Sequence, residues 1–189
     1  IDPATRDWLR AALMGGAAAE TRFTLAGNLA AFPFPNGKGG KLLLDTKAKG
    51  VTLAYADGWP PIDAIDANVR IEGTRLTVDA AGGRVHGVDI GRTRVEIADL
   101  ALEHPQLRID GEAAGPLAGF LRYLNGSPVA ARTGTITRLV EASGDGRLAL
   151  RIELPLGRPD DIRFAGEYTL SDAQLRIAAI RHLLGKNEE

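Results

Sequence analysis

The sequence predicts a mainly β protein, an antiparallel curved sheet with one apolar face and two short helices. Apolar and polar residues alternate over most of the chain, and clusters of Gly, Pro, Asn and Asp separate the alternating segments. Only two segments space their apolar residues as a helix does. Because successive strand side chains point to opposite faces, the alternation predicts strands with one apolar and one polar face.

Composition excludes several classes of function. The chain has 189 residues, of which 44% are hydrophobic and 25% charged, a formal net charge of −1 and no cysteine. A near-neutral chain without a basic cluster is not expected to bind nucleic acid, and disulfides and thiolate metal sites are excluded. No segment approaches the roughly 20 apolar residues that span a bilayer. Because the chain starts at Ile1, we expect it to be an internal fragment of a longer protein.

The first expected element is a helix near the N-terminus. Asp2 is suited to the N-cap and Pro3 to the first helical position. Gly15 and Gly16 are expected to end the helix. The residues expected to be buried on its apolar side are Trp8, Leu9, Ala12 and Leu13.

Strands are expected through most of the remaining chain. Strict alternation marks residues 65–72, 148–154 and 162–168. Further strands are expected at residues 41–46, 51–56, 75–80, 84–90, 93–97 and 173–177. Turn-forming clusters predict breaks at residues 36–40, 57–61 and 81–83. Roughly ten strands spaced about 4.8 Å apart would form a surface on the order of 45 Å across.

A five-residue pattern recurs, in which two apolar residues flank a polar one and a glycine ends the pattern. It occupies residues 23–27, 69–73, 107–111 and 162–166. The glycine would free the backbone to bend or turn at the end of a strand. The pattern indicates either a degenerate strand-turn repeat or a general property of strands that end in glycine, and the sequence leaves both open.

A second helix is expected from Pro116 to about Leu124, ended by residues 125–128. Its apolar side comprises Leu117, Phe120, Leu121 and Leu124. The tail, residues 177–184, could extend as helix or strand. We expect three aromatic residues to act as structural anchors, and these are Trp8, Trp59 and Phe120.

No catalytic, metal or cofactor site is expected, so the chain is not expected to be an enzyme. The histidines His86, His104 and His182 have no metal-ligand spacing. Asp57, Asp63 and Asp66 surround a proline-rich turn, where aspartates more often bond to nearby backbone than form catalytic pairs.

Several short segments, taken in order, resemble one known family. They are residues 8–16, which begin Trp-Leu and end Gly-Gly, Leu-Ala-Gly at 25–27, Phe-Pro-Phe at 32–34, residues 53–60, which end Asp-Gly-Trp-Pro, Gly-Pro-Leu at 115–117, Ser-Pro-Val at 127–129 and Leu-Pro-Leu at 154–156. Over most of its length the chain thereby resembles the YhdP-type, AsmA-like proteins of Gram-negative bacteria.

The resemblance implies a large protein anchored in the inner membrane, with a periplasmic body that forms a long β-groove. Such proteins are thought to pass phospholipids to the outer membrane and to support its permeability barrier. Residues 1–189 would then be a single domain, one segment of that groove, in the periplasm. The family has no catalytic residues to assign to this chain. The inner membrane would be reached through segments outside it.

Two hypotheses follow for the apolar face. In the first, it shields phospholipid acyl chains, and its candidate lining residues are Val69, Ile71, Leu107, Ile109, Leu150, Ile152, Ile162 and Phe164. In the second, the chain is a structural or protein-interaction domain whose apolar face is packed into a closed core. Alternation is the same in both, so the sequence does not separate them.

Overall fold

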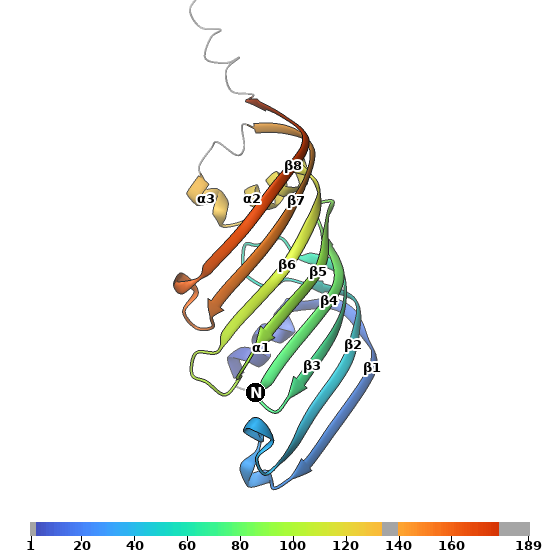
Figure 1. Ribbon diagram of the computed structural model, residues 1–189, viewed down its shortest axis with the longest axis vertical. Coiled ribbons are helices and arrows are strands. Elements are labelled where there is room, and N and C mark those ends of the chain that lie inside the picture. The colour runs from blue at the N-terminus through green and yellow to red at the C-terminus, as the bar shows by residue number, and fades with distance from the viewer. Residues whose placement is uncertain (1–2, 134–139, 178–189) are drawn as a thin grey trace, which may run out of the picture.

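The computed structural model describes residues 3–133 and 140–177, which form one curved antiparallel sheet that does not close (Figure 1). Strand accounts for 62% of the chain and helix for 17%, which confirms the mainly β prediction. The eight strands lie in the sheet in their sequence order, so each pairs only with its neighbours along the chain. Their bounds are β1 Leu13–Gly27, β2 Gly40–Leu53, β3 Ile62–Glu72, β4 Arg75–Val85, β5 Val88–Ile97, β6 Gln106–Pro116, β7 Val140–Pro155 and β8 Arg163–Ile177.

The helices are short and sit at the ends of the strands. The α-helices are α1 Pro3–Ala12, α2 Leu117–Asn125 and α3 Val129–Thr133, and the 3-10 turns are η1 Leu29–Ala31, η2 Pro35–Gly37 and η3 Pro159–Asp161. Both expected helices are present, whereas α3 was not expected. Figure 1 shows α2 and α3 on the concave side of the sheet. Among the described residues no helix is long and apolar enough to cross a membrane.

The structure corrects the expected boundary between the first helix and the sheet. The helix ends at Ala12, and β1 begins at Leu13, which is exposed and not buried on a helical face. Gly16 lies inside β1 with a φ of 121°. A Cβ atom there would lie 2.7 Å from Cγ2 of Val51, so this glycine permits close approach of β2 and does not end a helix.

Several expected breaks fall inside continuous strands. Residues 41–46 and 51–53 belong to the single strand β2, residues 54–56 follow that strand, and residues 173–177 belong to β8. The expected break at 81–83 is inside β4, because Gly83 makes room for the side chains of Ile62 and Ile65 on β3. The sheet therefore has eight strands and not ten.

The expected strand at residues 84–90 is a hairpin turn. Val85 pairs with Val88, and His86 and Gly87 between them have φ angles of 51° and 80°. Positive φ at both central residues is typical of the two-residue turn whose twist suits a hairpin. Histidine at this position gives no turn signal, which is why the turn was missed.

The glycines of the recurring five-residue pattern occupy two kinds of position, at the ends of strands and within them. Gly27 ends β1 and Gly73 follows β3, as expected, whereas Gly111 and Gly166 lie within β6 and β8. A Cβ atom at Gly111 would lie 2.8 Å from Oγ1 of Thr93, so this glycine accommodates a neighbouring strand. The N-cap expected at Asp2, the tail beyond residue 177 and His182 lie outside the described residues.

A bulge in β2 is held by one carboxylate. The pairing of β2 with β3 shifts register between Ala48 and Val51, and Gly50 there has a φ of 58°. The Asp66 carboxylate accepts hydrogen bonds from the Gly50 N–H and from Lys49 Nζ, both at 2.9 Å. These contacts lower the pKa of Asp66, with the Lys49 hydrogen bond as the largest cause.

We expect Asp66 to make the sheet acid-sensitive. A carboxyl with a lowered folded-state pKa stabilises the fold above its unfolded pKa, and that stabilisation is lost as pH falls through the folded value. The melting temperature of the wild-type chain should therefore decrease as the pH drops below about 4. The melting temperature of the Asp66→Asn chain should depend less on pH over the same range. Asp57→Asn is the control, because Asp57 makes no ion pair with a described residue. An equal acid dependence in the Asp66→Asn chain would contradict the assignment.

Helix α2 is docked on the β4–β5 hairpin through a residue without a side chain. A Cβ atom at Gly119 would lie 2.8 Å from both the His86 carbonyl oxygen and Cγ2 of Val88. Arg122, one turn later, donates a hydrogen bond to the same carbonyl at 2.9 Å. The absence of a side chain at 119 therefore sets how closely α2 approaches the sheet.

Gly119→Ala is expected to destabilise the chain, although alanine is the better helix former by about 1 kcal/mol. The backbone carbonyl of His86 cannot turn aside, so the added methyl group should cost about 1–3 kcal/mol through overpacking. Urea denaturation measures the effect. Ala118→Gly, in the same helix, controls for helix propensity alone and should lower the free energy of unfolding by about 1 kcal/mol. A Gly119→Ala chain more stable than wild type would show that α2 is not docked in this way.

Candidate functional site: the apolar concave face

Cross-strand register places the apolar residues in four rows on one face of the sheet, called here the concave face. Row 1 comprises Phe23, Leu44, Ile71, Leu76, Ile97, Leu107 and Leu154. Row 2 comprises Thr21, Thr46, Val69, Val78, Val95, Ile109, Ile152 and Phe164. Row 3 comprises Ala48, Ala67, Ala80, Thr93, Gly111, Leu150 and Gly166. Row 4 comprises Val51, Ile65, Gly83, Ile90, Ala113, Leu148 and Tyr168.

The rows make a broad apolar surface. Along β6, the distance from Leu107 in row 1 to Ala113 in row 4 is about 20 Å. Across the sheet, the eight strands at about 4.8 Å spacing extend on the order of 35 Å. The threonine hydroxyl groups within the rows bond locally, since Thr21 pairs with Thr46 at 2.8 Å and Thr93 donates to the Gly91 carbonyl oxygen at 3.3 Å. These threonines therefore add no unpaired hydroxyl to the apolar surface.

Side chains of the same chain leave most of this face uncovered. The buried apolar residues among those described are Ala12, Phe34, Ala67, Val85, Val88, Ile97 and Leu117. Of these, only Ala67 and Ile97 belong to the rows. Exposure is greatest on the two edge strands, where Phe23 is 62% and Phe164 76% exposed. The described residues supply no second layer over the middle of the sheet, so the face is an open trough.

The structure brings most of the predicted lining residues together on this face. Those in the rows are Val69 and Ile71 on β3, Leu107 and Ile109 on β6, Leu150 and Ile152 on β7, and Phe164 on β8. Ile162 is the exception, because it precedes β8 in the connection after η3. Whether these residues contact lipid stays a prediction.

Sequence reasoning missed the contributions of the other strands to the same rows. Leu44, Val78 and Val95 occupy rows 1 and 2 between or beside the predicted residues. Alternation at residues 75–80 and 93–97 was already visible and could have identified the last two. In β1, the run Ala17-Ala18-Ala19 has no alternation, so this part of the sheet could not be recognised from its pattern of apolar residues.

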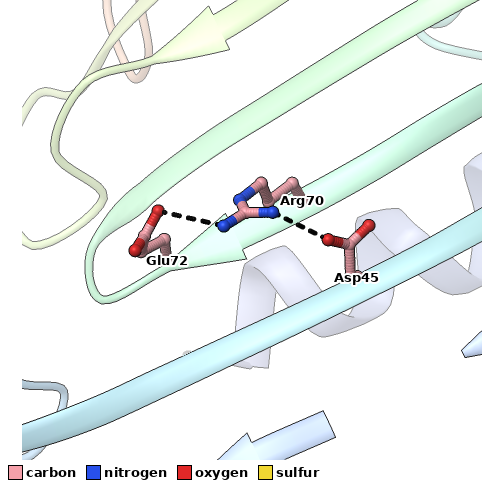
Figure 2. A network of polar contacts seen from close by, with 3 residues as sticks. All are labelled: Asp45, Arg70 and Glu72. Carbon is pink, nitrogen blue, oxygen red and sulfur yellow. Dashed lines mark hydrogen bonds and ion pairs between the residues drawn. The ribbon is translucent and has the colours of Figure 1, made fainter. Parts of the chain in front are cut away.

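The opposite, convex face is covered by cross-strand ion pairs. Figure 2 shows Arg70 on β3 between Asp45 on β2, at 2.8 Å, and Glu72 on its own strand, at 3.5 Å. The other pairs between neighbouring strands are Glu20–Lys47, Lys49–Asp66, Arg75–Glu96, Asp79–Arg94, Arg84–Asp89, Arg108–Glu153 and Asp110–Arg151. Exposed pairs of this kind contribute little to stability, because water and salt screen them. They mark the convex face as the one that faces water.

One end of the strands is closed by aromatic side chains, and we call it the helical rim: α1, residues 54–61 and α2. The Trp59 ring lies 5.9 Å from that of Tyr55 and 5.8 Å from that of Tyr123. The two tyrosine hydroxyls hydrogen-bond to each other at 2.5 Å, and burial raises the pKa of both. Trp8 donates its indole N–H to the Tyr55 carbonyl oxygen at 3.1 Å. These contacts join α1, the β2–β3 connection and α2.

The three expected anchors all lie at this rim. Trp59 is half-buried in the cluster, while Trp8 is 48% exposed and is held mainly through its indole N–H. Phe120 on α2 packs edge-on against Tyr168 of β8, with ring centroids 5.0 Å apart. Their contribution to stability remains a prediction.

The other end of the strands is different, and we call it the loop rim: residues 28–39, 73–74, 98–105 and 156–162. Phe34 is buried there, close to Gly40 and edge-on to Phe32. Leu156 is half-buried, and the exposed large apolar side chains of these loops are Leu29, Phe32, Leu100, Leu102 and Ile162. This rim has no α-helix among its described residues.

Other chemistry has little support among residues 3–133 and 140–177. They hold no group of three or more His, Asp or Glu side chains placed to bind one metal ion. His86 lies in the β4–β5 turn and His104 in the β5–β6 connection. Asp63 and Asp66 lie within β3 and not in a turn, and they bond across to β2: Asp63 accepts a hydrogen bond from Thr52 at 3.0 Å, and Asp66 accepts from the Gly50 N–H and from Lys49 Nζ. These carboxylates therefore hold neighbouring strands together and do not make the local turn bonds that were expected.

Comparison with known proteins adds one finding. A protein-family model described as YhdP protein matches residues 1–187. A search of curated proteins and a search of solved structures each found no match.

Proposed function

The chain belongs to the YhdP family, and from this premise we propose that it is one segment of a periplasmic β-groove that shields phospholipid acyl chains. The lipids would pass between the inner and outer membranes and so support the outer-membrane barrier. Family membership is consistent with a role in lipid transport. The observation that most supports the proposal is the open concave face, apolar in all four rows.

The energetics suit transport better than tight capture. Moving an acyl chain from water onto the concave face gains about 0.8 kcal/mol for each buried methylene. Because the rows contain no charged side chain, neighbouring positions along the trough are chemically similar. A chain could therefore move from one position to the next without breaking a strong polar contact. No catalytic residue, metal or cofactor is needed for this role.

The edge strands support the view that residues 1–189 are one unit of a longer groove. β1 and β8 each have a neighbour on one side only, and their concave-face residues Phe23 and Phe164 are highly exposed. Unpaired edges are normally protected in soluble sheets. Further strands of the same protein, in antiparallel alternation, would pair with both edges and lengthen each row. The inner membrane would be reached through segments outside this chain.

Native mass spectrometry of the purified chain tests the proposed function. We expect co-purified phospholipid, released when the protein is denatured and identified from the lipid extract. A domain with a closed apolar core would carry none. A chain that is free of lipid after purification and also fails to bind added phospholipid would overturn the proposal.

A further inference from the structure

The two rims of the trough differ, and the difference bears on how a lipid would lie in it. Helix α2 forms a wall at the helical rim through contacts on three sides. Gly119 and Arg122 contact the β4–β5 hairpin, Phe120 contacts β8 through Tyr168, and Tyr123 contacts the β2–β3 connection through Tyr55 and Trp59. One helix thus closes the trough from the β2–β3 connection to the last strand.

Polar groups of that wall bond within it. The Tyr55 and Tyr123 hydroxyls bond to each other, the Trp8 indole N–H to the Tyr55 carbonyl oxygen, and the Arg122 guanidinium to the His86 carbonyl oxygen. The wall therefore presents mainly aromatic and aliphatic surface to the trough. A charged headgroup placed against it would lose hydration without gaining free donors from these groups.

The loop rim differs from this wall, although exposed charges also occur elsewhere at the helical rim, at Arg10 and Asp57. Its exposed apolar side chains extend the concave face, and beyond them lie exposed charges of both signs, Lys38, Glu103 and Asp160. None of these three makes an ion pair with a described residue. A zwitterionic headgroup would remain hydrated there. Its positive and its negative group would each lie beside protein charges of the opposite sign.

The depth of the trough matches the length of an acyl chain. Rows 1 to 4 span about 20 Å along a strand, and one leaflet of a bilayer has a hydrocarbon thickness of about 15 Å. An acyl chain laid along the strands would therefore fit between the rims, with its methyl end at one and its headgroup at the other.

We propose that bound phospholipids are oriented in the trough, with their headgroups at the loop rim and the ends of their acyl chains at the helical rim. This inference rests on the proposed function and adds the polarity of the site to it.

Fluorescence quenching tests the orientation, because both tryptophans, Trp8 and Trp59, lie at the helical rim. The chain is loaded with phosphatidylcholine that has a nitroxide either near the end of one acyl chain or on the choline headgroup. A second protein, Phe32→Trp in a Trp8→Phe, Trp59→Phe background, reports from the loop rim. Native mass spectrometry verifies equal loading, and thermal melts verify that both proteins are folded.

The expected result is a crossed pattern. The chain-end nitroxide should quench Trp8 and Trp59 more than the headgroup nitroxide does, and the order should reverse for tryptophan at position 32. The opposite pattern, equal quenching by both lipids at each rim, or bound lipid that quenches neither rim would overturn the orientation while leaving lipid binding intact. Failure to load any lipid would instead overturn the proposed function and the orientation with it.

Discussion

Replacing Ile109 by glutamate is expected to leave the chain folded and to remove its bound phospholipid. Ile109 lies in row 2 of the concave face, half-buried between Val95 and Ile152. On an open trough the new carboxylate stays hydrated when no lipid is bound, so folding should lose little. Acyl chains cannot cover the carboxylate without dehydrating it, which costs several kcal/mol for an unpaired charge. That cost exceeds the free energy gained by burying several methylene groups of the acyl chain.

A thermal melt and native mass spectrometry of the same preparation measure the two effects. In a closed core, the buried unpaired charge would cost about 3–5 kcal/mol, a large share of the roughly 5–15 kcal/mol by which a domain is stable. An absent folding transition would therefore exclude an open trough at Ile109. Asn68→Glu is the matched control, because it adds the same charge to the exposed convex face. Retained lipid in the Ile109→Glu chain would show that lipid does not contact row 2.

Removing the Trp59 side chain is expected to cost about 3 kcal/mol or more in unfolding free energy. The indole packs between the rings of Tyr55 and Tyr123 and so ties the β2–β3 connection to α2. Its truncation leaves a cavity between the two tyrosines, and their hydrogen bond loses its shield from water. Pro60, buried next to it, fixes the backbone and limits how far the connection can collapse into the gap.

Urea denaturation of Trp59→Ala and Trp59→Phe, compared with wild type, measures this contribution. Phenylalanine keeps a ring between the tyrosines, so its cost should be clearly smaller. Trp8→Ala is the comparison at an exposed position, where a hydrogen bond to the Tyr55 carbonyl oxygen is the main loss. An unchanged midpoint for Trp59→Ala would contradict the role of Trp59 as an anchor.

Much of the sheet was predictable because alternation is a local property of strands. Residues 65–72, 107–111 and 148–154 lie in strands and place their apolar side chains on one face, as predicted. Glycine was the main source of error. Gly83, Gly111 and Gly166 lie inside strands because neighbouring side chains need the space, and this depends on contacts that the sequence does not contain.

Whether the apolar face is covered could not be derived from the sequence. A core-facing strand and a groove-lining strand both alternate with period two, so Ile109 and Ile152 would have the same pattern in either fold. The structure separates the two possibilities through the position of α2, which sits at one rim and leaves most of rows 1 to 3 uncovered. That position is set by Gly119 against the His86 carbonyl oxygen, a contact between residues far apart in sequence.

Because the strands lie in sequence order, every strand pairing in the sheet joins two strands that are neighbours along the chain. Pairing can therefore begin at any hairpin and extend to its neighbours. The same order makes the structure nearly one-dimensional, with stability summed from nearest-neighbour pairings. Insertion or deletion of a hairpin would then change the length of the trough by about two strand spacings, near 10 Å, without disturbing the pairings elsewhere. The architecture thus allows evolution to change the length of the trough one hairpin at a time.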